Sequence, residues 1–117
     1  MRFAPHGAID VQDLDCDFLA CSPYKFYGPH QGVLWGRQEL LQTLPSYKLR
    51  VVADELPGRW ETGTQSLEGQ AGTIGALEYI AALGVEQGAE HRPTTPGLSE
   101  RTRDLHAGMR AMAHYEE

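Results

Sequence analysis

Apolar residues near the N-terminus form two short runs, each bounded by residues that favour turns. Residues 17–21 are almost continuously apolar, a pattern typical of a strand buried on both faces of an α/β sheet. Residues 33–35 predict a second strand. About ten residues without helical periodicity separate the two runs, whereas a parallel crossover needs about a dozen or more. The two strands are therefore predicted to pair antiparallel.

Helical spacing of apolar residues begins after the second run. Residues 37–44 predict a short helix that ends before Pro45, because the residue preceding a proline disfavours helical geometry. The strongest helical pattern covers residues 67–83 and is closed by Gly84, a residue type common just beyond a helix C-terminus. The residues that recur at helical spacing on one predicted face are Leu67, Ala71, Ile74, Leu77 or Glu78, and Ala81.

A last amphipathic helix is predicted to begin at an N-cap, Ser99, and to run to Tyr115. Its buried stripe is predicted to be Leu105, Met109 and Met112. The preceding helix carries a glycine at every third position from residue 69 to residue 75. Each glycine inside a helix costs up to about 1 kcal/mol relative to alanine, so a closely packed neighbour is expected to compensate.

The predicted elements define an α/β chain with two short strands and about three helices. Two strands do not form an independent sheet, so these elements are expected to belong to a larger unit. Residues 1–84 are predicted to form part of a large domain, and residues 85–98 a polar connector rich in proline. Residues 99–117 would form the amphipathic helix that leads toward a C-terminal small domain.

Composition narrows the range of partners. The net charge of −6 argues against nucleic acid or an anionic membrane, and no apolar run approaches the ~20 residues of a membrane span. Cys16 and Cys21 are too few for a disulfide scaffold and would face opposite sides of one strand, so a reducing cytoplasm is expected. The histidines show no metal-ligand spacing, so no metal site is predicted.

Lysine is scarce in this chain, since eight of its ten basic residues are arginine. Lys25 lies in a loop with two prolines, two glycines and three aromatic residues, so the loop points to a site that requires an amine. An amine can form a Schiff base, whereas a guanidinium cannot and stays charged. The alternative is that Lys25 is an ordinary loop lysine.

The segment around Lys25 resembles a known family. Residues 22–29, Ser-Pro-Tyr-Lys-Phe-Tyr-Gly-Pro, are similar to the cofactor-lysine segment of the class V aminotransferase and cysteine desulfurase family of pyridoxal-phosphate enzymes. The likeness continues through residues 33–41. It resumes at Arg-Trp-Glu-Thr-Gly-Thr-Gln, residues 59–65, and at the glycine-rich helix that ends in Gly84. These motifs follow one another in the family's order.

The resemblance implies part of the large domain of a fold-type I enzyme, with pyridoxal 5′-phosphate as cofactor and Lys25 as its Schiff-base lysine. Ser22 and Tyr24 would contact the cofactor phosphate, although many members have histidine where this chain has Tyr24. Partial burial beside Tyr24, Phe26 and Tyr27 is expected to favour the neutral amine of Lys25. His30 is a candidate for a role on the substrate side.

The resemblance also implies a homodimer. In the family's dimers a Gly-Thr pair, here Gly63 and Thr64, reaches the phosphate bound by the partner subunit. The alternative for Thr64 is a helix cap for the helix that follows it. The acids at positions 10, 13, 15 and 17 are expected to form a solvated face.

The implied function is pyridoxal-phosphate chemistry on an amino-acid substrate, as a desulfurase, an aminotransferase or a lyase. The family's ring-holding aspartate and its substrate-binding arginine would lie before and after this segment, so the isolated chain is expected to be an inactive or nearly inactive interior piece. Two alternatives remain open: a non-catalytic truncated homologue that docks on a full-length subunit, and a fragment without function.

Overall fold

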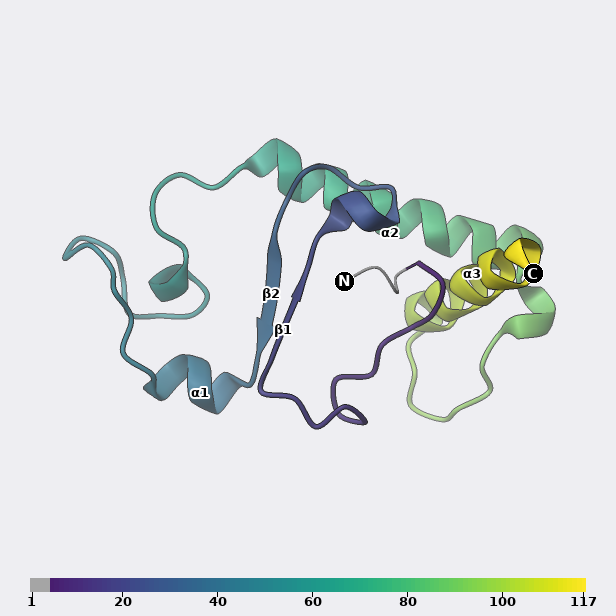
Figure 1. Ribbon diagram of the computed structural model, residues 1–117, viewed down its shortest axis with the longest axis horizontal. Helices are drawn as coiled ribbons and strands as arrows, with labels where there is room; N and C mark the ends of the chain where they lie inside the picture. The colour runs from purple at the N-terminus through teal and green to yellow at the C-terminus, as the bar shows by residue number, and fades with distance from the viewer. Residues whose placement is uncertain (1–4) are drawn as a thin grey trace.

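The computed structural model describes residues 5–117, so the first four residues of the predicted 1–84 unit lie outside it. Its main elements are strands β1 (Phe18–Cys21) and β2 (Val33–Gly36) and helices α1 (Gln38–Thr43), α2 (Leu67–Gln87) and α3 (Glu100–Glu116). The molecule is elongated: α2 runs along its length and α3 crosses the C-terminal half of α2 (Figure 1). Three short 3-10 helices connect these elements, η1 (Pro23–Phe26), η2 (Gly58–Trp60) and η3 (Ala89–His91).

The two strands pair antiparallel, as predicted, with Phe18 opposite Gly36 and Ala20 opposite Leu34. The prediction that β1 is buried on both faces is wrong, because its residues alternate between exposed and half-buried. Phe18 and Leu34 share one face and are 42% and 60% exposed. An α/β sheet buries both faces only when helices cover both, and within residues 5–117 the open face has no such cover.

Arg37, the residue after β2, contacts the segment just before β1. Its guanidinium pairs with Asp15 at 2.5 Å and Asp17 at 3.1 Å and donates to the carbonyl of Cys16. The hydrogen bond to Asp15 raises the pKa of Arg37, and the nearby carboxylates add to the effect. The two aspartates are exposed, as predicted, but they also serve as ion-pair partners.

Helix α2 extends beyond its predicted end at Gly84 to Gln87, with Gly88 as its C-cap. Three residues of the predicted 85–98 connector therefore belong to α2, and three more form η3. Gly84 lies where α2 crosses α3, and a Cβ on it would overlap the carbonyl oxygen of Asp104. This glycine therefore allows α2 and α3 to pack closely and does not end α2. From the local sequence alone, a glycine in either role looks the same.

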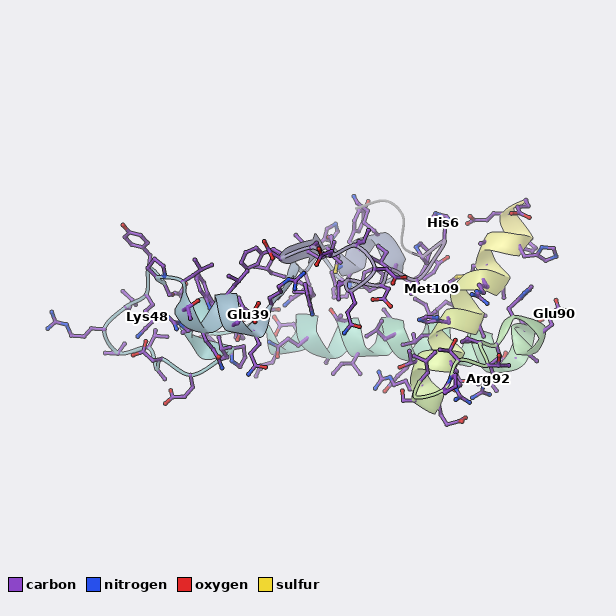
Figure 2. The ribbon with its side chains drawn as sticks, turned by 90° about the horizontal axis from the view of Figure 1, so that it is seen from below. His6, Glu39, Lys48, Glu90, Arg92 and Met109 are labelled. Atoms are coloured by element: carbon purple, nitrogen blue, oxygen red, sulfur yellow. The ribbon has the colours of Figure 1, made fainter. Side chains whose placement is uncertain are left out.

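The hydrophobic core is small and lies where η1 and α3 meet the middle of α2. Its buried members are Phe26, Ala76 and Ile80. The predicted stripe of α3 is confirmed, because Leu105, Met109 and Met112 pack against this cluster. Figure 2 shows Met109 on the face of α3 that turns toward the rest of the molecule.

The predicted stripe of α2 is only partly correct. Leu67 and Ile74 are 69% and 50% exposed, whereas the buried positions are Gly69, Ala76, Ile80 and Gly84. Small residues lie on the buried face because η1 and α3 approach the helix closely there. No helix within residues 5–117 is long and apolar enough to span a membrane.

Two of the three helix glycines have the close neighbour that was predicted. A Cβ on Gly69 would overlap the side chain of Gln31, and one on Gly72 would come within 3.2 Å of Pro29. The prediction is wrong for Gly75, which has open space around it. The loop that carries Lys25 therefore rests on the first turns of α2.

Candidate functional site

The sequence around Lys25 folds into η1, a single tight turn after β1. Ser22 is its N-cap residue and Pro23 occupies the first helical position, where the fixed φ of proline suits a helix start. A 3-10 helix has three residues per turn, so residues three apart share a face. Pro23 and Phe26 are accordingly both buried. Lys25 lies on the opposite face and is exposed.

The expected partial burial of Lys25 is therefore wrong for this chain. Of the three aromatic residues beside it, only Phe26 is buried, while Tyr24 and Tyr27 are 52% and 59% exposed. Phe26 is buried in one cluster with Ala76 and Ile80. This burial anchors the turn, while its neighbours face outward. The turn thus fixes the backbone of Lys25 while leaving its amine in solvent.

The turn ends at Tyr27, whose backbone has a left-handed conformation with a φ of +66°. A bulky residue in this left-handed region costs about 1–2 kcal/mol. Gly28 follows, and its N–H donates to the carbonyl of Pro23 at 2.8 Å. A Cβ on Gly28 would lie 2.6 Å from that of Pro23, so this glycine is needed for close approach rather than for a positive φ.

The loop then folds back beside Lys25. The Ser22 hydroxyl donates to the carbonyl of Gln31 at 3.4 Å. The ring of His30 stacks on that of Tyr24 with centroids 4.5 Å apart and planes inclined by 19°. The Lys25 ammonium lies over the same tyrosine ring, 5.1 Å from its centroid. Four of the predicted site residues, at positions 22, 24, 25 and 30, are therefore brought together in one loop.

The two lysines have contrasting environments. The ammonium of Lys48 donates to the carbonyl of Val52 at 2.6 Å and pairs with Asp54 at 3.1 Å. Its side chain is only 17% exposed, and it lies in the loop at the end of the molecule farthest from α3 (Figure 2). Lys25 makes no hydrogen bond or ion pair through its amine with any residue from 5 to 117. Its amine is thus the freer of the two.

Gly63 and Thr64 form a separate turn before α2. Gly63 has a φ of +77° and Thr64 is exposed. The helix is capped by Ser66, whose Oγ accepts from the N–H of Gly69 at 3.2 Å, so the alternative role of Thr64 as the cap is wrong. Within the described part of the chain, this turn makes no polar contact with the loop of Lys25.

The assignment of the cap predicts different effects for two neighbouring substitutions. Ser66→Ala should lower the free energy of unfolding by about 1 kcal/mol, because removing an N-cap oxygen leaves a helix N–H unpaired. Thr64→Ala should change it by less than about 0.5 kcal/mol, as expected for an exposed side chain outside such a feature. Urea unfolding of both variants measures the difference. An equal loss in both would contradict the assignment.

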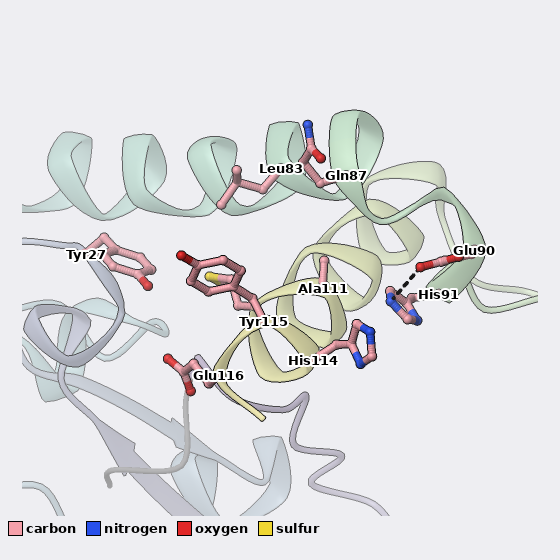
Figure 3. A pocket seen from close by; sticks show the side chains of 10 residues that line it. Tyr27, Leu83, Gln87, Glu90, His91, Ala111, His114, Tyr115 and Glu116 are labelled. Carbon is pink, nitrogen blue, oxygen red and sulfur yellow. Dashed lines mark ion pairs between the residues drawn. The ribbon is translucent and has the colours of Figure 1, made fainter.

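A cavity of about 530 Å³ lies between the C-terminal turns of α2 and α3. Tyr27 and Tyr115 line it from opposite sides, and Glu90 pairs with His91 at its far end (Figure 3). Lys25 is not among the residues that line this cavity. Within residues 5–117 no three histidine, cysteine or acidic side chains gather as metal ligands.

The donor groups of the loop suit the two reactive ends of a phosphorylated aldehyde such as pyridoxal phosphate. A free primary amine suits the aldehyde end, and hydroxyl groups suit the phosphate. The amine is that of Lys25, and the hydroxyls are those of Ser22 and Tyr24. The hydrogen bond from Ser22 to Gln31 is long, at 3.4 Å. Replacing it by a hydrogen bond to a phosphate oxygen would therefore cost little free energy.

Comparison with known proteins identifies the family of the chain. A family model described as aminotransferase class-V matches residues 2–100. The chain is 43% identical over 94 residues to a cysteine desulfurase of Dickeya dadantii (strain 3937), covering 69% of this chain and 23% of that protein. It is 38% identical over 102 residues to a cysteine desulfurase of Klebsiella pneumoniae subsp. pneumoniae, covering 76% and 25%.

The chain thus spans about a quarter of the length of these curated relatives. A cysteine desulfurase of Pectobacterium carotovorum subsp. carotovorum (strain PC1) is 40% identical over 95 residues, covering 70% of this chain and 23% of that protein. No solved structure matches the chain significantly. The family match, over residues 2–100, includes both the lysine loop and the Gly-Thr turn.

Proposed function

The chain belongs to the class-V aminotransferase family, and on that premise we propose that it supplies the cofactor lysine of a pyridoxal-phosphate enzyme acting on an amino acid. Lys25 is the proposed lysine. The observation that carries the proposal is its free amine on a turn anchored by buried Pro23 and Phe26. The only other lysine, Lys48, is held by Val52 and Asp54.

Lys25 has two tasks in this proposal. Its Nζ would hold the cofactor at the aldehyde end. With an amino-acid substrate bound, the same Nζ would accept a proton from the substrate carbon and return it. The bound cofactor supplies the electron-withdrawing ring that stabilises negative charge at that carbon. A rigid turn keeps Nζ within reach during both tasks.

The remaining site residues are proposed to bind the cofactor phosphate or to face the substrate. Ser22 and Tyr24 would donate hydroxyl hydrogen bonds to the phosphate from beside Lys25. Gly63 and Thr64, on a turn apart from the lysine loop, suit the role of reaching the cofactor of a partner subunit in a homodimer. His30, stacked on Tyr24, would lie on the substrate side.

Among the three reaction types, removal of sulfur from cysteine is favoured by the names of the relatives, all cysteine desulfurases. Neither cysteine of this chain suits the sulfur-accepting nucleophile. Both are free thiols, but Cys21 packs against the core and Cys16 lies 3.9 Å from the carbonyl of Val11. Neither belongs to the loop of Lys25.

Borohydride reduction in the presence of pyridoxal phosphate tests the proposal. Reduction converts the reversible bond into a stable phosphopyridoxyl group, which intact mass and peptide mapping locate. We expect the label on Lys25, with Lys48 as an internal control in the same molecule. Equal labelling of both lysines, or none, would overturn the proposal for this chain.

A second candidate function is a docking module for a full-length homologous subunit. The exposed apolar face of the two-stranded sheet, with Phe18 and Leu34, favours it, because exposed apolar patches commonly mark interaction sites. Size-exclusion chromatography of the chain alone tests the docking function. A well-folded monomer would count against it, whereas a folded oligomer fits both candidates, because the first also includes a homodimer.

A further inference from the structure

The proposed place of His30 on the substrate side does not explain why its ring stacks on that of Tyr24. His30 comes five residues after the lysine, yet the loop turns back and places it 4.5 Å from the ring of Tyr24. Both rings are exposed, so core packing does not force them together. Two backbone hydrogen bonds produce the return: the Gly28 N–H donates to Pro23 and the Gln31 N–H to Pro29, both at 2.8 Å.

We propose that His30 is a positioning residue, which fixes the ring of Tyr24 so that this ring holds the amine of Lys25 over its face. This inference rests on the proposed function of Lys25. Tyr24 contacts both partners: its ring lies 4.5 Å from that of His30 and 5.1 Å from the Lys25 ammonium. His30 therefore acts on the amine through the tyrosine.

The physical reason is the loss of side-chain freedom. An exposed tyrosine rotates among several rotamers, and an exposed lysine has more freedom still. A near-parallel ring stack removes most of the freedom of Tyr24 and contributes beyond its buried area. A fixed ring face then attracts the ammonium electrostatically. This arrangement restricts Lys25 without burying it.

The imidazole adds nothing else that the structure requires. It makes no hydrogen bond or ion pair with any residue from 5 to 117, so its aromatic face is its one specific contact there. A phenyl ring of similar shape should therefore replace it, whereas a methyl group should not. This sets a positioning role apart from a chemical role of the imidazole nitrogens.

The test uses the full chain, reductively methylated at its lysines with ¹³C-formaldehyde, and follows the two dimethyl-lysine signals by NMR. Lys48→Arg assigns the Lys25 signal. The Tyr24 ring current should displace that signal from the Lys48 signal. His30→Ala should abolish most of the displacement and His30→Phe should restore it. His114→Ala, which removes an exposed histidine of α3, serves as the matched control and should change nothing.

Phosphopyridoxyl labelling of unmethylated samples supplies the second readout. Unchanged NMR signals in His30→Ala would overturn the inference while leaving the function of Lys25 intact. An NMR response without preferential Lys25 labelling in the wild-type chain would instead overturn the proposed function, and the positioning role with it.

Discussion

Replacing Lys25 by arginine should abolish the phosphopyridoxyl label at position 25 and reduce total labelling to the level of unselective amines. Arginine keeps the positive charge and can still lie over the ring of Tyr24, but its guanidinium does not form the covalent bond to an aldehyde. The loop around it should keep its fold, because Pro23 and Phe26 are its buried members. Intact mass before and after reduction measures the loss.

Lys48→Arg provides the matched control, since it removes the other lysine by the same substitution. It should leave the label at Lys25 unchanged. Peptide mapping also separates the side-chain label from label on the α-amino group, which is the remaining primary amine. A Lys25→Arg variant that keeps the wild-type amount of label, whether on Lys48 or on the terminus, would contradict the assignment of Lys25.

The second large effect is expected at the crossing of α2 and α3. Gly84→Val should lower the free energy of unfolding by about 3 kcal/mol, toward the upper end of the usual cost of overpacking. A Cβ at this position overlaps the carbonyl oxygen of Asp104 and lies 2.8 Å from the nitrogen of Gly108. Both are backbone atoms of α3, which cannot rotate aside, so the helices must separate. Urea unfolding followed by circular dichroism measures the loss.

Gly75 lies in the same helix and supplies the control. Apart from the backbone of α2 itself, nothing lies within 4 Å of a Cβ at this position, so Gly75→Ala should raise stability by up to about 1 kcal/mol through helix propensity alone. Gly84→Ala should be measured together with Gly75→Ala. The two substitutions add the same methyl group to the same helix, so the difference between their effects on stability measures the packing at the crossing. Equal changes in stability would show that α3 does not pack on Gly84.

Several features of the fold could be predicted because they depend on residues near one another in the chain. The antiparallel pairing of the strands follows from their short connection, and the stripe of α3 follows from the spacing of Leu105, Met109 and Met112. The N-cap at Ser99 is likewise local, and its side chain accepts from the N–H of Thr102 at 3.1 Å. Each of these signals involves residues within one or two helical turns or one short loop. Over such distances, standard helix and strand geometry fixes which residues lie close together.

The errors arose where a distant segment determined the outcome. Gly84 has the sequence context of a helix end, but Asp104 and Gly108 of α3, distant in the sequence, approach it closely, and only a glycine allows that contact. The buried face of α2 follows the small residues on which η1 and α3 rest, so its larger apolar side chains Leu67 and Ile74 remain exposed. Periodicity identifies a helix without identifying which neighbours it will meet.

The candidate site also has features that follow from the local sequence and features that depend on distant contacts. The sequence by itself determined the family, the candidate lysine and the proposed cofactor, because these follow from residue chemistry and motif order. Only the tertiary structure decided that Phe26 anchors the turn while Lys25 stays exposed, and that His30 stacks on Tyr24. Exposure and ring contacts depend on how the loop packs against α2, and that packing is set by contacts between residues distant in sequence.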